Sequence, residues 1–423
     1  MGLFKILVME ATQSHSRTAW IIVALLVPVA LLNYLDRQLL AAMRTSISIS
    51  IPALQDDANW GLLPALFKWS YAIFSPIGGW LADRYSKRRL IFGSLVVWSG
   101  MTIATGNCQS FESMCVVRAL MGVSEAFYIP AALALIADFH DGESRSRAVG
   151  YHQMGIYIGV TLGGFSGFAA GNPEAAGYVV NQWRMVFDGC GVLGIVYAIP
   201  LAMLLRDAPR KEDAKPRGVP ALEAMKELFT NRNFLLLAVC FTLPAIPGWV
   251  IKDWMPAILK SEFKITQGLA GALATVFVNF ASIIGAASGG LLSDRLNARS
   301  ERGRVLVSAA GLSIIMCMLL GVGFANGLVA VVVCLTVFGI GWGFFDCNNM
   351  PILSQIARPE LRATGYGFMN FISISVGGFA DQQFGVLRKA GVSNVVLFAS
   401  FAAAVAVAVV CMLCIKPPAA KGE

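Results

Sequence analysis

The sequence predicts an all-α membrane protein with twelve transmembrane helices, arranged as two pseudo-symmetric bundles of six. Of its 423 residues, 57% are hydrophobic and only 14% are charged, whereas soluble domains carry about a quarter charged residues. The apolar residues gather in stretches of membrane-spanning length, and two motifs of the first half recur in the second. This composition excludes a nucleic-acid-binding protein, a soluble enzyme and a disordered scaffold, despite the net charge of +8.

Twelve stretches approach the roughly 20 apolar residues that a helix needs to cross a bilayer. We expect transmembrane helices at residues 19–43, 60–82, 90–106, 113–137, 148–171, 185–205, 234–259, 267–293, 305–325, 328–353, 363–386 and 392–415. The first stretch lacks a small-residue cleavage pattern and contains Asp36 and Arg37, so we interpret it as a helix rather than a signal peptide. The nine cysteines form neither a disulfide framework nor a zinc pattern.

The midpoint of the chain divides two similar halves. The motif at residues 79–84 recurs at 290–295, and the motif at 147–151 recurs at 362–366. We therefore predict a tail at 1–18, a first bundle at 19–205, a linker at 206–233 with a short amphipathic helix at 221–229, a second bundle at 234–415 and a tail at 416–423. Parallel repeats of this kind are a transporter architecture, with the substrate site between the halves.

Basic residues predict the orientation. The loops after the even-numbered spans carry 19 lysines and arginines, whereas those after the odd-numbered spans carry six. Because basic loops stay on the cytoplasmic side, we expect both termini in the cytoplasm, and we expect a multi-pass protein of a bacterial inner membrane.

Charged residues at membrane depth are candidate functional groups, since one at the centre of a span costs at least about 2.5–3.5 kcal/mol. The basic ones are Arg37, Lys68, Arg118 and Lys252, and the acidic ones are Asp36, Glu125, Asp253 and Asp346.

The first span carries Asn33 and Arg37 on one helix face, with Tyr34 beside them. The guanidinium of Arg37 is permanently charged and offers a planar fork that matches a carboxylate or phosphate. We expect Arg37 to bind an anionic substrate group with help from Asn33 and Tyr34. The alternative is a structural ion pair with Glu125 or Asp346.

The fourth span places Arg118 and Glu125 two helical turns apart on one face, with Gly122 leaving room between them. Burial opposes ionisation of a carboxylate whereas a nearby arginine favours it. Glu125 and Arg118, with Asp36 on the first span, are therefore expected to form a proton-coupling site. Tyr128 follows on the same span and is a candidate for substrate binding.

The second half supplies the opposite wall. Aligning Pro130 with Pro351 puts Asp346 in the place of Glu125 and makes it a further proton-coupling candidate. Pro244 and Pro247 are expected to break the seventh span. Polar and aromatic residues suited to sugar hydroxyls are expected to complete the pocket: Trp342, Asn348, Asn349, Asn370 and Tyr157.

The repeated glycine, aspartate and arginine motif, the twelve spans and the basic central loop resemble the major facilitator superfamily. The motif is expected to latch the cytoplasmic side through Gly79, Asp83, Arg84, Arg88, Asp294 and Arg295. Asp36 and Arg37 together with Arg118 and Glu125 resemble the anion:cation symporter family, in which the arginine contacts substrate and the acids carry protons. The stretch 122–138 also resembles Spinster-type transporters, which export lysolipids or sphingoid phosphates.

We therefore expect a proton-coupled symporter of a small organic anion, a sugar acid such as a hexuronate, an aldonate or sialic acid, working by alternating access. A Spinster-like exporter of lysolipid or sphingoid amphiphiles is the alternative, and a transporter-like sensor a third. Neither a metal site nor an organic cofactor is expected. The coupling ion is expected to be a proton, with sodium left open, and the protein is expected to work as a monomer in the lipid bilayer.

Overall fold

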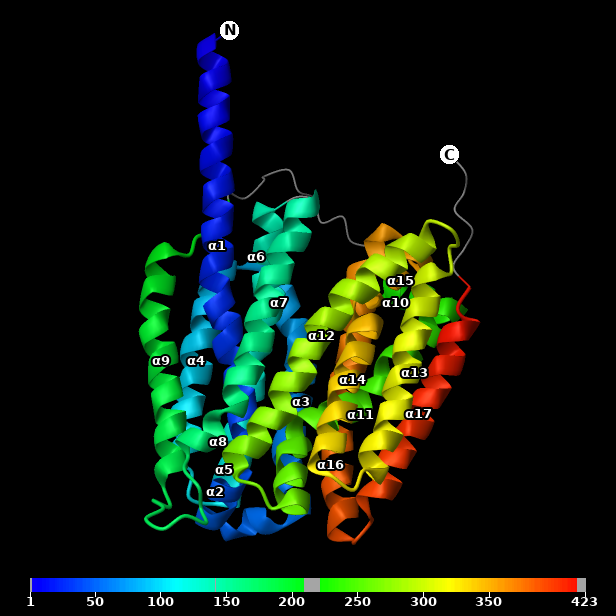
Figure 1. Ribbon diagram of the computed structural model, residues 1–423. Helices are drawn as coiled ribbons and strands as arrows, with labels where there is room; N and C mark the ends of the chain where they lie inside the picture. The colour runs from blue at the N-terminus through cyan, green and yellow to red at the C-terminus, as the bar shows by residue number, and fades with distance from the viewer. Residues whose placement is uncertain (1, 141, 209–220, 417–423) are drawn as a thin grey trace.

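The computed structural model describes residues 2–140, 142–208 and 221–416, and all regular secondary structure within them is helical (Figure 1). The first half contains α1 (Gly2–Ala42), α2 (Arg44–Ser50), the 3-10 helix η1 (Pro52–Gln55), α3 (Asp57–Arg84), α4 (Lys87–Asn107), α5 (Phe111–Glu125), α6 (Tyr128–Phe139), α7 (Gly142–Gly164), α8 (Ser166–Ala169) and α9 (Gln182–Leu204). The predicted linker helix is present as α10 (Ala221–Thr230).

The second half contains α11 (Arg232–Phe263), α12 (Gln267–Asn297), α13 (Gly303–Phe324), α14 (Leu328–Asp346), α15 (Asn349–Ile356), α16 (Pro359–Lys389) and α17 (Asn394–Cys414). With α5–α6 and α14–α15 each forming one traverse, the described residues contain the twelve expected helical crossings. Nine of these crossings are apolar enough to span a membrane by composition alone. The less apolar α3, α7 and α16 carry Lys68, Gln153 and Asp381.

Two of the crossings are interrupted at symmetry-related places. The α5 helix ends at Glu125 and α6 begins at Tyr128, while α14 ends at Asp346 and α15 begins at Asn349. Each break lies just before a proline, Pro130 or Pro351, which has no N–H to continue the helical ladder. The two acidic residues therefore occupy equivalent places, each at the last residue before a break.

The prediction that proline breaks the seventh span is wrong. The α11 helix runs from Arg232 to Phe263 with Pro244, Pro247 and Pro256 inside it. A proline removes one hydrogen bond from a helix, and packing against neighbouring helices can hold the remaining turns in place.

Glycines bring the crossing helices close together. On α7, Gly155, Gly159 and Gly163 lie against the backbone of α1, so that any side chain there would meet a carbonyl oxygen of α1. This spacing of small residues lets helix backbones approach closely in a membrane. The α1 and α7 helices consequently pack along most of their shared length.

The glycine Gly122 on α5 provides a test of this packing. A Cβ atom at position 122 would overlap the hydroxyl of Ser70 and the carbonyl of Phe67 on α3. We expect Gly122→Ala to lower the stability of the purified protein by about 1–3 kcal/mol, as overpacking does, and to lower its melting temperature in detergent. Gly79→Ala is the matched control, because a Cβ at Gly79 meets no atom within 4 Å. Equal melting temperatures for the two variants would show that α3 and α5 are not tightly packed.

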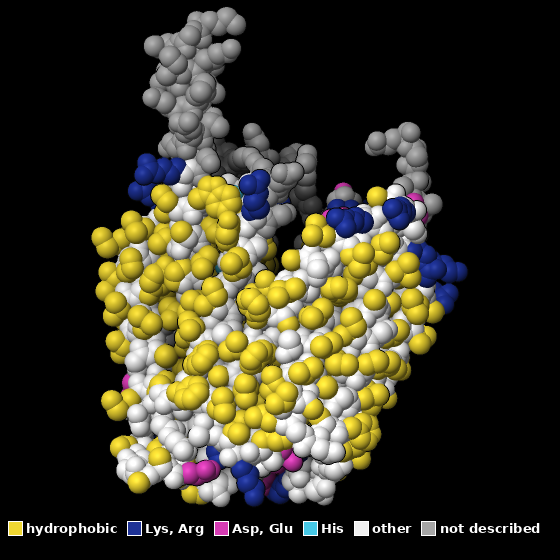
Figure 2. All heavy atoms as spheres, viewed as in Figure 1, with side chains coloured by type: hydrophobic (Ala, Val, Ile, Leu, Met, Phe, Trp, Pro, Cys, Tyr) yellow, Lys and Arg dark blue, Asp and Glu magenta, His cyan; other side chains and the backbone are white. Residues whose placement is uncertain are grey.

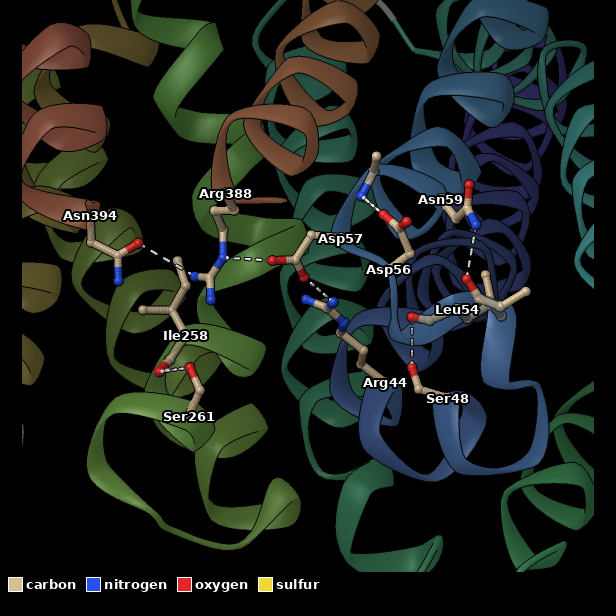
Figure 3. Close-up of polar contacts among 12 residues, drawn as sticks. Arg44, Ser48, Leu54, Asp56, Asp57, Asn59, Ile258, Ser261, Arg388 and Asn394 are labelled. Atoms are coloured by element: carbon tan, nitrogen blue, oxygen red, sulfur yellow. Dashed lines mark hydrogen bonds and ion pairs between the residues drawn. The ribbon is translucent and has the colours of Figure 1, made fainter. Parts of the chain in front are cut away.

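The two halves meet most closely at the end of the bundle where α2 lies, which we call the α2 end (Figure 1). There, Arg388 of α16 donates to Asp57 of α3 at 3.2 Å, and Asp57 is also paired with Arg44 of α2 (Figure 3). A second bridge joins Lys389 to Asp56 at 2.5 Å, and a third joins Lys260 to Glu174 at 2.9 Å. These ion pairs hold the halves together at the α2 end.

The opposite end, where α17 ends, we call the termini end. Figure 2 shows a notch between the halves at this end, with lysine and arginine side chains on its rims. Two ion pairs of the described residues at this end each lie within one half: Lys87 pairs with Asp138 at 2.9 Å, and Arg304 pairs with Asp294 at 3.1 Å. The described structure is therefore closed at the α2 end and open at the termini end.

Candidate functional site

A pocket lies between the halves and is partly open to solvent. Basic and aromatic side chains from both halves dominate its lining: Arg37, Lys68, Arg118, Lys252, Tyr34, Trp60, Phe67 and Trp249. Asp253 is the acidic residue among the lining groups. The pocket therefore suits an anion that also presents apolar surface.

The guanidinium of Arg37 is held at the wall of this pocket. Its Nε donates to Glu125 Oε2 at 2.7 Å, and its Cζ lies 4.6 Å from the ring of Tyr34, 4.8 Å from that of Phe67 and 4.9 Å from that of Tyr71. Such cation–π contacts contribute about 0.5–2 kcal/mol each. Within the described residues, the buried Nη2 of Arg37 has no hydrogen-bond partner, which leaves one edge of the fork free.

The acidic groups lie behind Arg37, inside the first half. Glu125 is fully buried, and Asp36 is buried and accepts a hydrogen bond from Thr102 of α4 at 2.9 Å. Asn33 is buried beside Glu125. The sequence left open whether Arg37 binds substrate or pairs with a protein carboxylate, and this structure contains the pair with Glu125.

Arg118 connects the acids to the pocket. It is buried on α5, lines the pocket and lies within electrostatic range of both Glu125 and Asp36. Its Nη1 lies 3.3 Å from the sulfur of Met121, which is a weak acceptor. The predicted proton-coupling residues of the first half are thus brought together around a single pair of arginines.

A second charged cluster lies at the pocket; its members Lys68 and Asp253 were candidates from the sequence, whereas its third member, Asp381, was missed. Lys68 of α3 forms ion pairs with Asp253 of α11 and with Asp381 of α16. Its ammonium also lies 4.5 Å from the ring centroid of Trp249. We name Lys68, Asp253 and Asp381 the lysine cluster. Asp381, an acidic residue inside a long apolar stretch, was the signal that could have predicted it.

Lys252 forms no ion pair with its sequence neighbour Asp253 among the contacts of the described residues. Its Nζ lies 5.2 Å from the ring of Trp249 and it lines the pocket. Its backbone carbonyl accepts a hydrogen bond from Gln38 of α1 at 3.2 Å. Lys252 is therefore a pocket cation of the second half.

The amide residues predicted to bind sugar hydroxyls lie away from the pocket lining. The amide of Asn348 donates to the carbonyl of Phe344 at 2.9 Å inside the break of the tenth crossing. Asn349 is buried and donates to Asp346 at 3.4 Å. A helix break leaves backbone carbonyls without their usual hydrogen-bond donors. The Asn348 amide donates to one of these carbonyls and is therefore not available to a substrate.

The other residues that were predicted to complete the pocket lie near Asp346 or beside its helix. Asp346 is exposed, and Tyr157 of α7 and Tyr366 of α16 lie within its electrostatic range. Asn370 interacts with Tyr366 one turn away, whereas Trp342 stacks on Phe338 and fills the space above Gly248 of α11. These groups form a polar surface distinct from the pocket lining.

The prediction that Tyr128 binds substrate is wrong. Its side chain is fully buried in the first half, and its hydroxyl lies 3.1 Å from the carbonyl of Leu26 and 2.9 Å from His152 Nε2. Tyr128 therefore does not reach the pocket. The hydroxyl thus links α6, α1 and α7.

Gly78, which precedes Gly79 of the repeated motif, is the glycine that lies against a neighbouring helix. A Cβ at Gly79 would meet open space, whereas one at Gly78 would meet the backbone of Ala126 and Phe127. The repeat behaves alike, since Gly290 faces open space and Gly289 packs against Phe344. Consecutive residues of a helix point about 100° apart, so only one of each glycine pair can face the neighbouring helix.

The charged residues of the repeated motif lie at the termini end. The side chain of Asp83 lies outside the described residues. Arg84 is exposed and its guanidinium lies 4.1 Å from the ring of Trp80, and the backbone N–H of Arg88 donates to Asp207 at 2.9 Å. In the second half, Asp294 pairs with Arg304 and Arg295 is exposed.

Near the second repeated motif, arginines lie at the ends of α6 and α15. Arg145 donates to the carbonyls of Ala137 and His140 at 3.2 and 3.0 Å. Arg362 donates in the same way to two carbonyls at the end of α15, at 2.8 and 3.1 Å. Arg145 therefore makes the same kind of contact with the end of α6 that Arg362 makes with the end of α15.

Comparison with known proteins places these features in a wider context. The chain is 28% identical over 380 residues to Protein spinster of Drosophila melanogaster, an alignment that covers 86% of this chain and 61% of that protein. It is 27% identical over 383 residues to Protein spinster homolog 1 of Mus musculus, covering 84% of this chain and 70% of that one. The chain thus spans less than two thirds of the length of the fly protein.

Solved structures share the fold. A bacterial homolog of the human lysosomal transporter Spinster, in an inward-facing and unoccupied conformation, superposes with a TM-score of 0.73 at 22% identity, covering 94% of this chain and 95% of that one. A D-xylose-proton symporter superposes with a TM-score of 0.75 at 14% identity, covering 94% and 97%. The sequence profile of the Major Facilitator Superfamily matches residues 26–380, so this multi-pass membrane protein belongs to the Major Facilitator Superfamily.

Proposed function

We propose that the protein is a proton-coupled secondary transporter of an anionic amphiphile, such as a lysolipid or a sphingoid phosphate. The lining of the pocket is the observation that carries this proposal, because it combines four cationic side chains with four aromatic ones. An anionic headgroup satisfies the cations, and an apolar chain fits the aromatic surface. The stretch 122–138 resembles Spinster-type transporters, which export amphiphiles of this class, and the similarity of the chain to two spinster proteins supports that resemblance.

Arg37 is proposed to bind the anionic headgroup. Its guanidinium now pairs with Glu125 at 2.7 Å, and a substrate anion competes with that carboxylate for the same fork. Protonation of Glu125 removes the competing charge and frees Arg37 for the substrate. Asp36, which shares the electrostatic environment of Arg118 with Glu125, is proposed to carry a proton as well.

The termini end is proposed to face the cytoplasm, since basic residues border the notch at that end (Figure 2). The described conformation is then inward-facing, with the three ion-pair bridges of the α2 end closing the outer side. Opening that end requires these bridges to break while the termini end closes, which is the alternating-access cycle.

A small sugar acid is the second candidate substrate. The observation that favours it is the polar surface around Asp346, where Tyr157 and Tyr366 gather. The amphiphile is the better candidate, because the amide of Asn348, which was expected to bind a sugar hydroxyl, donates to its own helix instead.

Uptake by proteoliposomes with an imposed pH gradient tests the proposal. Radiolabelled lysophosphatidic acid and sphingosine phosphate represent the amphiphiles, and galactonate and glucuronate represent the sugar acids. We expect gradient-dependent movement of an amphiphile that excess galactonate does not inhibit. Movement of galactonate alone would support the sugar-acid function, and movement of neither class would contradict both.

A further inference from the structure

A buried amide joins the two halves at the α2 end. Gln267, the first residue of α12 in the second half, is 3% exposed. Its Nε2 donates to the hydroxyl of Ser46 and to the carbonyl of Gly171, each at 2.6 Å, and its Oε1 accepts from the backbone N–H of Ser46 at 3.3 Å. Ser46 lies on α2 and Gly171 follows α8, so all three bonds cross from one half to the other.

The two backbone groups that this amide binds both lie next to helix ends. Ser46 belongs to the first turn of α2, where N–H groups have no partner in their own helix, and Met43 before that helix makes no side-chain cap. Gly171 follows the last turn of α8 with a φ of +78°, a backbone conformation that glycine adopts without strain. Gln267 therefore caps two helix ends of the first half from the second half.

Glycines hold the backbone of α12 against α8. A Cβ atom at Gly167 would lie 2.9 Å from the backbone carbonyl of Gln267, and one at Gly268 would lie 2.8 Å from the backbone nitrogen of Phe168. A larger residue at either place would push the two helices apart. The amide is thus fixed in place by backbone contacts. Any separation of α12 from α2 and α8 breaks its three bonds together, because they share one side chain.

The three bridges already described at the α2 end are ionic. Ion pairs that are partly exposed weaken as the salt concentration rises, because dissolved ions screen them. The amide of Gln267 carries no charge and does not titrate. Its contribution to closure is therefore of a different physical kind from that of the bridges.

We propose that Gln267 is an uncharged latch that holds the α2 end closed and that must be released before this end opens. The proposal rests on the alternating access of the proposed function, and it does not depend on which substrate is carried. In the closed state, one side chain satisfies one donor and two acceptors of the first half. When the halves separate, the same groups bond to water, so the net stabilisation from these hydrogen bonds belongs to the closed state alone.

Distance measurement between spin labels tests the latch. The labels replace Val116 on α5 and Val396 on α17, which are 59% and 57% exposed, in full-length protein in nanodiscs with its native cysteines replaced. Gln267→Leu keeps the approximate size of the side chain but leaves a buried N–H and a buried carbonyl without this partner in the closed state. We expect the long-distance population to rise by at least about tenfold relative to the short one. Ser46→Ala removes only one of the three bonds and is expected to give a smaller rise.

Gln355→Leu is the matched control. Gln355 lies on α15 at the termini end, where its Nε2 donates to Asn297 of α12 at 3.1 Å. Both residues belong to the second half, so loss of this bond is expected to leave the ratio of long to short distances unchanged. If Gln355→Leu raised that ratio as much as Gln267→Leu does, the effect would be a general one and the latch would be ruled out.

Gln267→Glu makes the latch depend on pH. Its carboxyl group can still accept from Ser46, but it can donate to the carbonyl of Gly171 only when it is protonated. The closed state of this variant therefore favours the protonated carboxyl group, whereas the open state leaves it in water with an ordinary pKa of about 4.3. Because the closed state holds more protons, acid favours closure and a rising pH favours opening. Between pH 5 and pH 7, we expect the long-to-short ratio to rise by at least about tenfold more in this variant than in the parent protein.

The comparison with the parent protein separates this effect from other titrating groups. On the elements around position 267, Arg44 of α2 pairs with Asp57, and Glu174 of the α8–α9 connection pairs with Lys260 of α11. Lys264 is exposed in the connection before α12. These groups are present in the parent and in the variant alike, so the difference between the two pH dependences reports the new carboxyl group.

Two results support the latch: a rise of the ratio in Gln267→Leu without one in Gln355→Leu, and the added pH dependence in Gln267→Glu. Parent-like distances in Gln267→Leu, or a parent-like pH dependence in Gln267→Glu, would overturn it. Gln267→Glu keeps the size of the side chain and its bond from Ser46, so it decides the matter if Gln267→Leu does not fold.

The readout needs no substrate, which separates this proposal from the proposed function. The expected distances in a protein that moves neither class of substrate would contradict the proposed substrates and support the latch. Distances that stay short in every variant would contradict alternating access and the latch together.

Discussion

Replacing Arg37 by alanine is expected to weaken binding of the anionic substrate by at least about 100-fold. Loss of a charged hydrogen-bonding partner in a buried site costs about 2–5 kcal/mol, and about 2.8 kcal/mol corresponds to a factor of 100. Arg37→Lys keeps the charge but loses the planar fork and the stacking on Tyr34, Phe67 and Tyr71, so an intermediate loss of about tenfold is expected. Titration of intrinsic tryptophan fluorescence with lysophosphatidic acid measures both effects.

Arg37→Ala also leaves the buried carboxylate of Glu125 without its partner, which by itself can destabilise the protein. The double variant Arg37→Ala with Glu125→Gln removes both charges and is expected to restore the melting temperature without restoring binding. Arg299→Ala, at an exposed position, is the control for loss of a positive charge. Parent-like affinity in the folded double variant would remove Arg37 from the binding site.

Replacing Glu125 by glutamine is expected to abolish accumulation of substrate against its gradient, with a loss of at least tenfold in the final concentration ratio. Glutamine has the size of protonated glutamate but cannot release a proton, so the step that couples the pH gradient to movement is missing. Because the neutral side chain leaves Arg37 free, exchange of internal for external substrate without a pH gradient is expected to continue.

Two measurements in the same proteoliposomes check this expectation: accumulation driven by an imposed pH gradient, and counterflow at equal pH. Glu223→Gln on the exposed face of α10 is the matched control and should resemble the parent in both. If Glu125→Gln accumulated substrate uphill as the parent does, the proton-coupling site would have to lie elsewhere. If counterflow were also lost, Glu125 would be needed for substrate binding rather than for coupling.

The fold could be predicted from the sequence because membrane solvation imposes strong local rules. A crossing helix must satisfy its own backbone hydrogen bonds and present about 20 apolar residues to the lipid. These rules predicted the twelve crossings. The amphipathic pattern predicted the helix at 221–229, which the structure has at Ala221–Thr230, and alignment of Pro130 with Pro351 predicted the equivalence of Glu125 and Asp346. They did not predict that α11 continues through Pro244 and Pro247, because neighbouring helices decide whether a proline interrupts a buried helix.

Only some residues of the candidate site could be predicted from the sequence. Arg37, Arg118 and Glu125 were named as candidates because each is a charge at membrane depth, and the structure places them close together. Asn348 and Tyr128 were misplaced because a polar side chain can be satisfied by a backbone carbonyl of its own helix or of a neighbouring one. The residue type alone does not reveal whether a polar side chain will bind a substrate or a backbone carbonyl.

The sequence by itself determined that this protein lies in a lipid bilayer, how many helices cross it, and which charged residues within those helices are energetically unfavourable. These properties depend only on the order of residues along the chain. Tertiary structure alone decided which charges meet. Lys68 is 185 positions from Asp253 and 313 from Asp381, and its pairing with Asp381 is possible because Gly61 and Gly378 let α3 and α16 approach closely. A pairing across the boundary of two halves depends on how those halves pack, and a local pattern contains no information about that contact.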